Sequence, residues 1–208
     1  GKTRFLSSEC RRLGVKKFVY LGTLGAALRA PGEYLRTKWL AEEEVRRSGV
    51  DYVIVRSPLI FGKSFGVRES KVVAKLKELI RTAERAVPIL GSGKNLLQPI
   101  FVGDVVRCLE KAAADPAVRD ETIDLGGPEQ LSFEEIIAIL MTRLGVKKKK
   151  IKIPFPIAFA LAYVLERIKA SPRITTDQVR MLREDVVCNL DRMNRFFGPP
   201  TVSFRDGA

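Results

Sequence analysis

Apolar and polar positions along this chain fall into blocks that predict strands and helices in alternation. Two short apolar, β-branched runs, residues 16–21 and 52–56, have the length and composition of buried strands. Between them, residues 33–48 combine helical periodicity with dense charge, and Gly49 ends the predicted helix. A helix over residues 4–13, ended by Gly14, precedes the first strand. The first third of the chain therefore predicts a helix, strand, helix, strand order.

The remaining sequence continues this alternation. Helices are predicted over residues 71–86, over 132–144 with a Ser132/Glu135 capping box, over 154–168 and over 177–183. Another helix is predicted to run to residue 114, with Asp104 as its cap or its first residue. Residues 88–102 are predicted to be mostly extended, 121–125 a strand, 147–153 a basic strand or loop, and the tail after Asp185 mixed. This order is typical of βαβ units, so we expect an α/β fold whose strands 18–21 and 52–55 are parallel neighbours.

Composition narrows the chemistry. The 208 residues are 46% apolar, enough for one domain with a core or for a domain and a small lobe. There is no histidine, and the three cysteines stand apart, so neither a zinc site nor a Ser-His-Asp mechanism is expected. Acid/base chemistry is left to Tyr, Lys, Asp, Glu or Cys. Unpaired cysteines suit a reducing compartment, which predicts a cytoplasmic protein.

The net charge of the chain indicates which classes of partner it could attract. The formal net charge of +13 attracts nucleic acid, anionic lipid or phosphorylated ligands. Nucleic acid is not expected, because the chain has no recognisable binding motif or aromatic platform. Residues 155–165 are apolar on most faces and follow four lysines at 147–150. Burial of this helix is the leading interpretation, and peripheral contact with an anionic membrane surface is the alternative.

The most informative short segment runs from Tyr34 to Lys38. The two residues stand at i and i+4, so they share one face of the predicted helix. A nearby ammonium favours the phenolate, which makes such a tyrosine a usable acid/base for a carbonyl or alcohol. Spacing alone also fits two surface residues of an amphipathic helix, so the pair gains meaning from its position between two apolar strands.

In this context the sequence resembles the extended and atypical short-chain dehydrogenases/reductases. Within that group it is similar to NmrA-like and isoflavone-reductase-like proteins and to the Rossmann-type accessory subunit of respiratory complex I. The segments that carry the resemblance are residues 14–20, the Tyr34/Lys38 pair, residues 56–62, residues 98–105, and 126–128 with 132–135. It implies a Rossmann-type parallel sheet, here its second half, with a small, mostly helical substrate lobe.

The resemblance also implies roles for individual residues. Tyr34 would be the acid/base, Lys38 would lower its pKa and hold the nicotinamide ribose, and Thr23 would replace a serine that polarises the carbonyl. The cofactor would be NADP or NAD. Its expected contacts are Gly22, Thr23, Leu24, Lys38, Pro58, Leu59 and Ile60, and the expected substrate contacts are Phe61 and Gln98.

Two departures from the family pattern matter. No GxxGxxG-type loop that would hold the pyrophosphate occurs near the start, so the chain is expected to enter the fold about 90 to 110 residues late. A missing amino-terminal half or a partner chain would then complete it. In addition, Gly22 stands where the family has serine, or the serine role has moved to Thr23.

These expectations lead to two hypotheses about function. The first hypothesis is hydride transfer to or from a carbonyl, an alcohol or a nucleotide-sugar-type small-molecule substrate. The alternative is a non-catalytic, NADPH-binding structural or redox-sensing subunit of a larger complex.

Residues 1–66 are predicted to form the second half of the Rossmann-type domain with its active-site helix. Residues 67–208 would supply the remaining sheet elements and the substrate lobe, interleaved with the first part.

Overall fold

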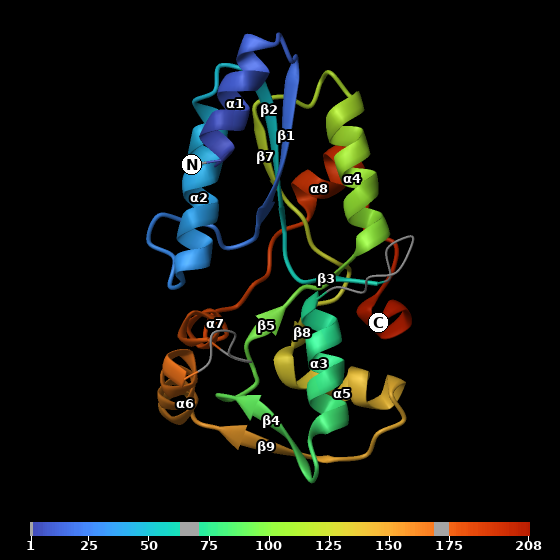
Figure 1. The fold of residues 1–208 in the computed structure, drawn as a ribbon. Helices are drawn as coiled ribbons and strands as arrows, with labels where there is room; N and C mark the ends of the chain where they lie inside the picture. Colours follow the sequence, from blue (N-terminus) through green and yellow to red (C-terminus); the bar gives the residue numbers. More distant parts are fainter. Residues whose placement is uncertain (1, 63–70, 169–174) are drawn as a thin grey trace.

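Three parallel strands form the main sheet of the protein. A computed structural model describes residues 2–62, 71–168 and 175–208. The sheet contains β1 (Lys17–Thr23), β2 (Asp51–Ser57) and β7 (Glu121–Asp124), in the order β1-β2-β7 (Figure 1). All neighbours run parallel, and Phe18 lies opposite Tyr52. The predicted parallel pairing of the first two strands is therefore confirmed, and so is the α/β fold class.

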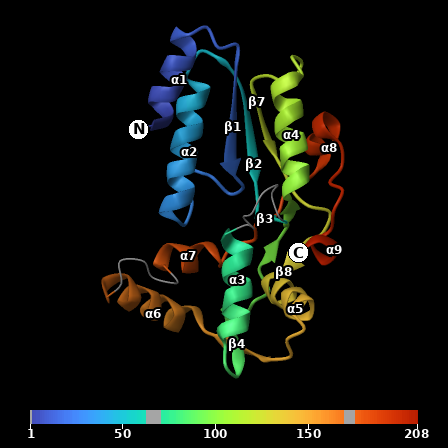
Figure 2. The same ribbon diagram turned by 45° about the vertical axis from the view of Figure 1, so that its right-hand side comes forward.

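Helices cover both faces of this sheet (Figure 2). On one side lie α1 (Lys2–Arg12) and α2 (Glu33–Arg46), and on the other α4 (Val102–Ala114) and α8 (Asp191–Phe197). The α4 side is a continuous apolar core, because buried valines of β2 meet residues of α4 and α8 that have no exposed surface. Parallel sheets need such two-sided cover, since both faces of their strands are apolar.

A second lobe lies at the carboxyl ends of these strands. Its elements are α3 (Lys71–Thr82), β4 (Ala86–Leu90), β5 (Leu96–Leu97), β8 (Leu131–Ser132), α5 (Phe133–Arg143), β9 (Lys149–Ile153), α6 (Phe155–Ile168) and α7 (Thr176–Met181). β4 pairs in parallel with β9, and β5 pairs antiparallel with β8. Buried residues of α3, β4 and α5 form the core of this lobe.

The two lobes are joined where β3 (Ile60–Phe61) pairs in parallel with β6 (Ile100–Phe101). Phe61 has no exposed surface, and its ring centroid lies 5.8 Å from that of Phe101 and 5.0 Å from that of Phe204. Phe204 begins the last helix, α9 (Phe204–Gly207). The predicted boundary between residues 66 and 67 lies outside the described residues. α4, β7 and α8 return to the first lobe, so the chain crosses between the lobes more than once.

Several element boundaries differ from the predictions. α3 ends at Thr82 rather than at residue 86, because Ala86 already pairs with Lys149 in the β4–β9 ladder. α4 begins at Val102, with Phe101 as its N-cap, so the prediction that Asp104 caps or begins this helix is wrong. Asp104 is instead buried and accepts hydrogen bonds from the Thr201 amide and hydroxyl, at 2.9 and 2.8 Å.

Candidate functional site

Lys38 lies on α2 and reaches the carboxyl end of β1. Its ammonium donates hydrogen bonds to the Leu21 carbonyl oxygen at 3.2 Å and to the Tyr20 hydroxyl at 3.4 Å. It also lies 5.1 Å from the centroid of the Tyr20 ring. Burial, and then the nearby Glu42 carboxylate, raise the pKa of Tyr20, so this phenol stays neutral beside the ammonium. The structure thus places a cation at the strand end where open α/β sheets bind ligands.

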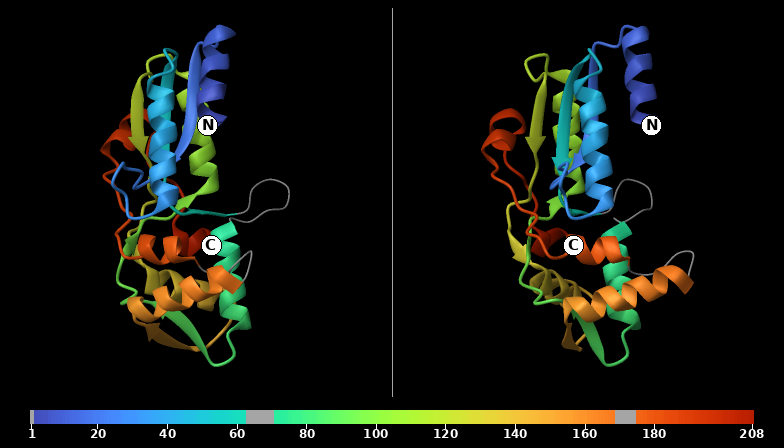
Figure 3. Two further views of the ribbon diagram at one scale, coloured as in Figure 1. Left: turned by 60° about the vertical axis from the view of Figure 1, so that its left-hand side comes forward. Right: turned by 90° about the vertical axis from the view of Figure 1, so that its left-hand side faces the viewer.

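Tyr34 lies in the first turn of α2, one turn before Lys38, and is 48% exposed. Its position is held from the other lobe. The carboxylate of Asp177 on α7 accepts hydrogen bonds from the backbone amides of Glu33, at 2.6 Å, and Tyr34, at 3.2 Å. α7 lies directly beneath this end of α2 in each view (Figures 1 and 3). The N-cap residue, Gly32, has no side chain to cap the helix, so Asp177 supplies the cap from a distant segment.

The close approach of α7 also explains the glycine at position 32. A Cβ atom there would lie 3.0 Å from both Asp177 Oδ1 and Met181 Cγ. A side chain at this position would therefore require the Asp177 and Met181 side chains to shift by a few tenths of an ångström. The turn that carries Tyr34 thus depends on contact with the second lobe.

Gly22, in β1, faces the buried carboxylate of Glu42. A Cβ atom at this position would lie 2.8 Å from Glu42 Oε1 and 3.4 Å from Arg56 Cγ. Glu42 has no exposed surface, and Arg56 on the neighbouring strand β2 holds it by hydrogen bonds. The glycine that stands in the family's serine position is therefore required locally by an ion pair. Its contact with the cofactor stays a prediction.

The other expected cofactor contacts cluster at the ends of β1 and β2. Thr23 lies opposite Ser57 in the parallel register, and the Leu24 amide donates to the Ser57 carbonyl at 2.9 Å. The chain then passes through Pro58, Leu59 and Ile60, all partly exposed, into β3. The structure brings these residues to the same edge of the sheet as Lys38.

The two expected substrate residues lie deeper. Phe61 belongs to the aromatic cluster between the lobes described above. Gln98 is 3% exposed; its Nε2 donates to the Gly127 carbonyl at 3.0 Å, and its Oε1 accepts the Cys188 amide at 2.9 Å. Both side chains join segments of the chain in this structure, and their contact with a substrate stays a prediction.

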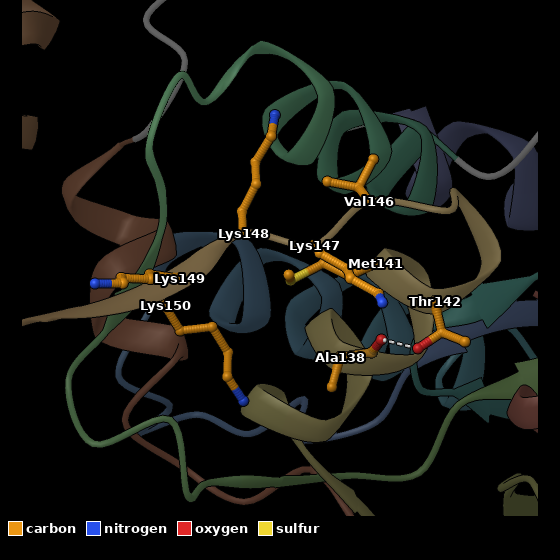
Figure 4. A pocket seen from close by; sticks show the side chains of 8 residues that line it. All are labelled: Ala138, Met141, Thr142, Val146, Lys147, Lys148, Lys149 and Lys150. Atoms are coloured by element: carbon orange, nitrogen blue, oxygen red, sulfur yellow. Dashed lines mark hydrogen bonds between the residues drawn. The ribbon is translucent and has the colours of Figure 1, made fainter.

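A pocket of about 460 Å³ lies elsewhere, between α5 and β9. It is lined by Ala138, Met141, Thr142, Val146 and Lys147 to Lys150 (Figure 4). Its lining residues include no acid/base pair. The Thr142 hydroxyl already donates a hydrogen bond to the Ala138 carbonyl at 3.1 Å. None of the expected site residues lines it, so we place the candidate site at the ends of β1 and β2.

Sequence reasoning missed three residues that shape this site: Tyr20, Glu42 and Asp177. Tyr20 could have been found, because period-two alternation places it on the same face of β1 as Gly22. Arg56 is a charged residue at the end of an apolar strand, which is a signal for a paired cation, whereas Glu42 lies among other charged residues of its helix and could not be singled out. Nothing in the sequence indicated the role of Asp177, since it lies 144 residues from Glu33, whose amide donates a hydrogen bond to its carboxylate.

Comparison with known proteins agrees with the observed fold. The model of the NAD dependent epimerase/dehydratase family matches residues 2–126, and the chain belongs to this family. The chain is 26% identical over 183 residues to NADH dehydrogenase (ubiquinone) 1 alpha subcomplex subunit 9, mitochondrial, of Arabidopsis thaliana, covering 84% of this chain and 44% of that protein. The mouse protein of the same name is 25% identical over 174 residues, covering 81% and 42%. The chain thus spans less than half the length of these curated relatives.

Solved structures share the fold at low sequence identity. A nucleoside-diphosphate-sugar epimerase from Staphylococcus aureus superimposes with a TM-score of 0.75 at 15% identity, covering 99% of this chain and 68% of that one. UDP-glucuronic acid 4-epimerase from Bacillus cereus, solved with UDP-glucuronic acid and NAD, gives 0.69 at 18% identity, covering 99% and 63%. The similarity to NmrA-like and isoflavone-reductase-like proteins stays a prediction.

Proposed function

We propose that the protein binds NAD or NADP at the carboxyl ends of β1 and β2 and transfers hydride to or from a carbonyl or alcohol carbon. A nucleotide-sugar-type molecule is the expected substrate class, because the solved structures with this fold include epimerases of such sugars. The observation that carries the proposal is the Lys38 ammonium at the end of β1, one helical turn from an exposed tyrosine.

The residues at this edge fit a nicotinamide nucleotide. One of the two hydrogen bonds of Lys38 is long, at 3.4 Å, so its ammonium can turn from Tyr20 to ribose hydroxyls. The backbone of residues 58–60 would lie beside the nicotinamide, which supplies or accepts the hydride when bound. The first amides of α2 already bind the Asp177 carboxylate, so the pyrophosphate would have to be held elsewhere.

Tyr34 would move the proton. Its hydroxyl would donate to the developing alkoxide in reduction and accept the alcohol proton in oxidation. A cation such as Lys38 nearby favours the phenolate and so makes this exchange easier near neutral pH. The Thr23 hydroxyl would hydrogen-bond the same substrate oxygen, in the role for which the family has serine.

Tyr34→Phe in the complete protein tests this mechanism. Removing the phenol oxygen should lower turnover by about 10²- to 10⁴-fold while cofactor affinity stays nearly unchanged. Lys38→Met should weaken both, because Lys38 would have two roles. Tyr163→Phe is the matched control, since Tyr163 is 47% exposed but lies on α6. Full activity of Tyr34→Phe on any substrate would overturn the mechanism.

A second candidate is a non-catalytic, NADPH-binding structural or redox-sensing subunit. The curated relatives favour it, because they are named as subunits of NADH dehydrogenase. The Gly22–Glu42 contact also favours it, because a serine cannot enter that position without displacing the carboxylate. Tight NADPH binding in calorimetry, without oxidation of NADPH by a broad panel of carbonyl compounds, would support this candidate over the enzyme.

We also propose that a further segment, from an amino-terminal half or a partner chain, covers β1. Within the described part of the chain, β1 is an edge strand of its sheet. Apolar side chains of α1 and of the turn that leads into β1 are also exposed: Phe5 at 66%, Leu6 at 53% and Leu13 at 66%. Mass spectrometry of the purified protein tests the first source, since a mass well above that of 208 residues would show the additional polypeptide.

A further inference from the structure

Helix α6 has two apolar faces and only one of them is packed. Ala158 and Ala162 are buried, and with Phe159 they pack against Ile153 of β9 and Val179 of α7. A second, separate face carries a stripe spaced by three and four residues, which 3.6 residues per turn places on one side. The stripe consists of Ile157, Leu161, Val164 and Ile168, exposed by 60%, 50%, 49% and 72%. A solvent-facing stripe is normally polar, so this one is suited to a non-aqueous contact.

The charges beside α6 are mostly positive. Arg167 lies on the flank of the stripe and stacks on the Tyr163 ring, 4.5 Å from its centroid. Arg180 and Arg183 of the neighbouring α7 segment lie over the rings of Phe159 and Phe155. The acidic Glu166 is turned toward α7, where it accepts a hydrogen bond from the Thr176 amide at 3.0 Å. Arg167 therefore borders the apolar stripe, and Arg180 and Arg183 add two cations beside the packed face of the same helix.

Strand β9, which directly precedes α6, adds an exposed apolar side chain and a cation beside the helix. Side chains of a strand alternate, so Lys149 and Ile151 share the face of Ile153, which packs against the α6 cluster. Ile151 is 55% exposed. Lys149 is also exposed, and it forms no hydrogen bond or ion pair within the described part of the chain. Lys150 and Lys152, on the other face, share one carboxylate, that of Glu134, at 2.7 and 3.4 Å, so the three groups together keep one positive charge. Figure 4 shows Lys149 and Lys150 leaving the strand in different directions.

The placement of α6 leaves this surface accessible. In every view the helix lies at the edge of the second lobe, far from the three-stranded sheet (Figures 1 to 3). No helix in the described ranges is long and apolar enough to cross a membrane. α6 itself has 14 residues, whereas a spanning helix needs about 20. Its geometry is that of a helix lying in the plane of an interface.

We propose that α6, together with Lys149 and Ile151 of β9, docks onto the surface of an anionic lipid bilayer. The apolar stripe enters the boundary between headgroups and acyl chains, and the bordering cations bind lipid phosphates. Charge complementarity favours this occupant over a second copy of the chain, because two copies would bring like charges together. The net charge of +13 acts in the same direction.

A single tryptophan placed in the stripe tests the contact directly. Trp39, on α2, is the only tryptophan, so Leu161→Trp in a Trp39→Phe background reports on α6 alone. Adding vesicles of phosphatidylcholine and phosphatidylglycerol in equal parts should shift its emission to shorter wavelength, while phosphatidylcholine vesicles should not. Leu28→Trp in the same background is the control, because Leu28 is 58% exposed but lies outside α6. No shift for the Leu161→Trp protein, or an equal shift with both vesicles, overturns the proposal.

Co-sedimentation with the same anionic vesicles measures how much individual side chains contribute to binding. Leu161→Ser should lower the bound-to-free ratio about tenfold, whereas Leu28→Ser should not change it. Lys149→Gln should lower it about fivefold, and Lys16→Gln, an exposed lysine before β1, should have a smaller effect. Circular dichroism would show that each variant is folded. If the protein instead forms a dimer in sedimentation velocity that Leu161→Ser abolishes, and binds no vesicles, a second copy covers the stripe and the proposal is wrong.

Discussion

The buried carboxylate of Glu42 and the partly buried guanidinium of Arg56 form an ion pair with two hydrogen bonds between α2 and β2. Arg56 Nε lies 2.9 Å from Glu42 Oε1, and Arg56 Nη2 lies 2.6 Å from Oε2. The hydrogen bond with Glu42 is the main cause that raises the pKa of Arg56. Such bidentate geometry fixes both side chains, so the pair sets the distance of α2 from the sheet. Lys38 lies one turn before Glu42, and its position at the end of β1 therefore depends on this pair.

Gly22→Ala should destabilise the protein by about 1 to 3 kcal/mol, because the added methyl group would overlap the Glu42 carboxylate. Urea unfolding followed by circular dichroism measures this change. Leu21→Ala is the neighbouring control: Leu21 is exposed, so its effect should be near 0.5 kcal/mol or less. Unchanged stability of Gly22→Ala would mean that the Glu42–Arg56 pair can move away from β1 at no cost.

Asp177→Ala should remove the cap that α7 provides to α2. The loss of a capping carboxylate typically costs about 1 kcal/mol, to which the lost helix-dipole interaction contributes. Hydrogen exchange should show faster exchange at the Glu33 and Tyr34 amides, which the carboxylate accepts. Glu184→Ala, an exposed acid just after α7, is the control and should leave both amides protected. Equal protection in the two variants would contradict the cap.

The capping box of α5 should make stability depend on pH in the acid range. Hydrogen bonds from the Ser132 hydroxyl and amide lower the pKa of Glu135 from its ordinary value of 4.5. A lowered carboxylate pKa adds stability above 4.5 that is lost as pH falls through the folded-state pKa. Glu135→Gln should therefore lose less stability between about pH 5 and pH 3 than the unaltered protein. Because Glu135 is exposed, the difference should stay below about 0.5 kcal/mol.

Thermal unfolding at several pH values would measure this difference. Glu110→Gln, an exposed residue of α4, serves as the control and should follow the unaltered protein. A steeper acid loss in Glu135→Gln than in the unaltered protein would contradict the sign of the effect.

The three thiols should differ in reactivity. Burial raises the pKa of Cys108 and of Cys188 to about 11 in each case. Cys108 has no exposed surface, and Cys188 Sγ donates to the Leu125 carbonyl at 3.2 Å. At pH near 8 both should react with iodoacetamide about 10²-fold more slowly than an ordinary thiol. Peptide mapping should find Cys10, on α1, modified first; modification of Cys108 at the same rate would contradict the buried assignment.

The segments predicted from periodicity illustrate how far local information reaches. The strands around Val19 and Val53 and the helix between them form as expected, because β-branched runs and helical spacing are local properties. The Ser132/Glu135 capping box is confirmed for the same reason, since both partners lie within one turn. The incorrect prediction that Asp104 caps or begins α4 shows the limit of local information. The carboxylate of Asp104 binds Thr201 instead, which is 97 residues away in the sequence.

By itself, the sequence determined the helix, strand, helix, strand order of the first third of the chain, the parallel pairing of β1 with β2 and the presence of Tyr34 and Lys38 on one helix. Only the tertiary structure decided which distant residues complete the site: Asp177 at the start of α2, Glu42 beneath Gly22, and Tyr20 beside Lys38. It also decided that one apolar face of α6 remains exposed. The physical reason is that spacing along the chain sets which side chains share a face, whereas the packing of segments far apart in sequence sets what that face meets.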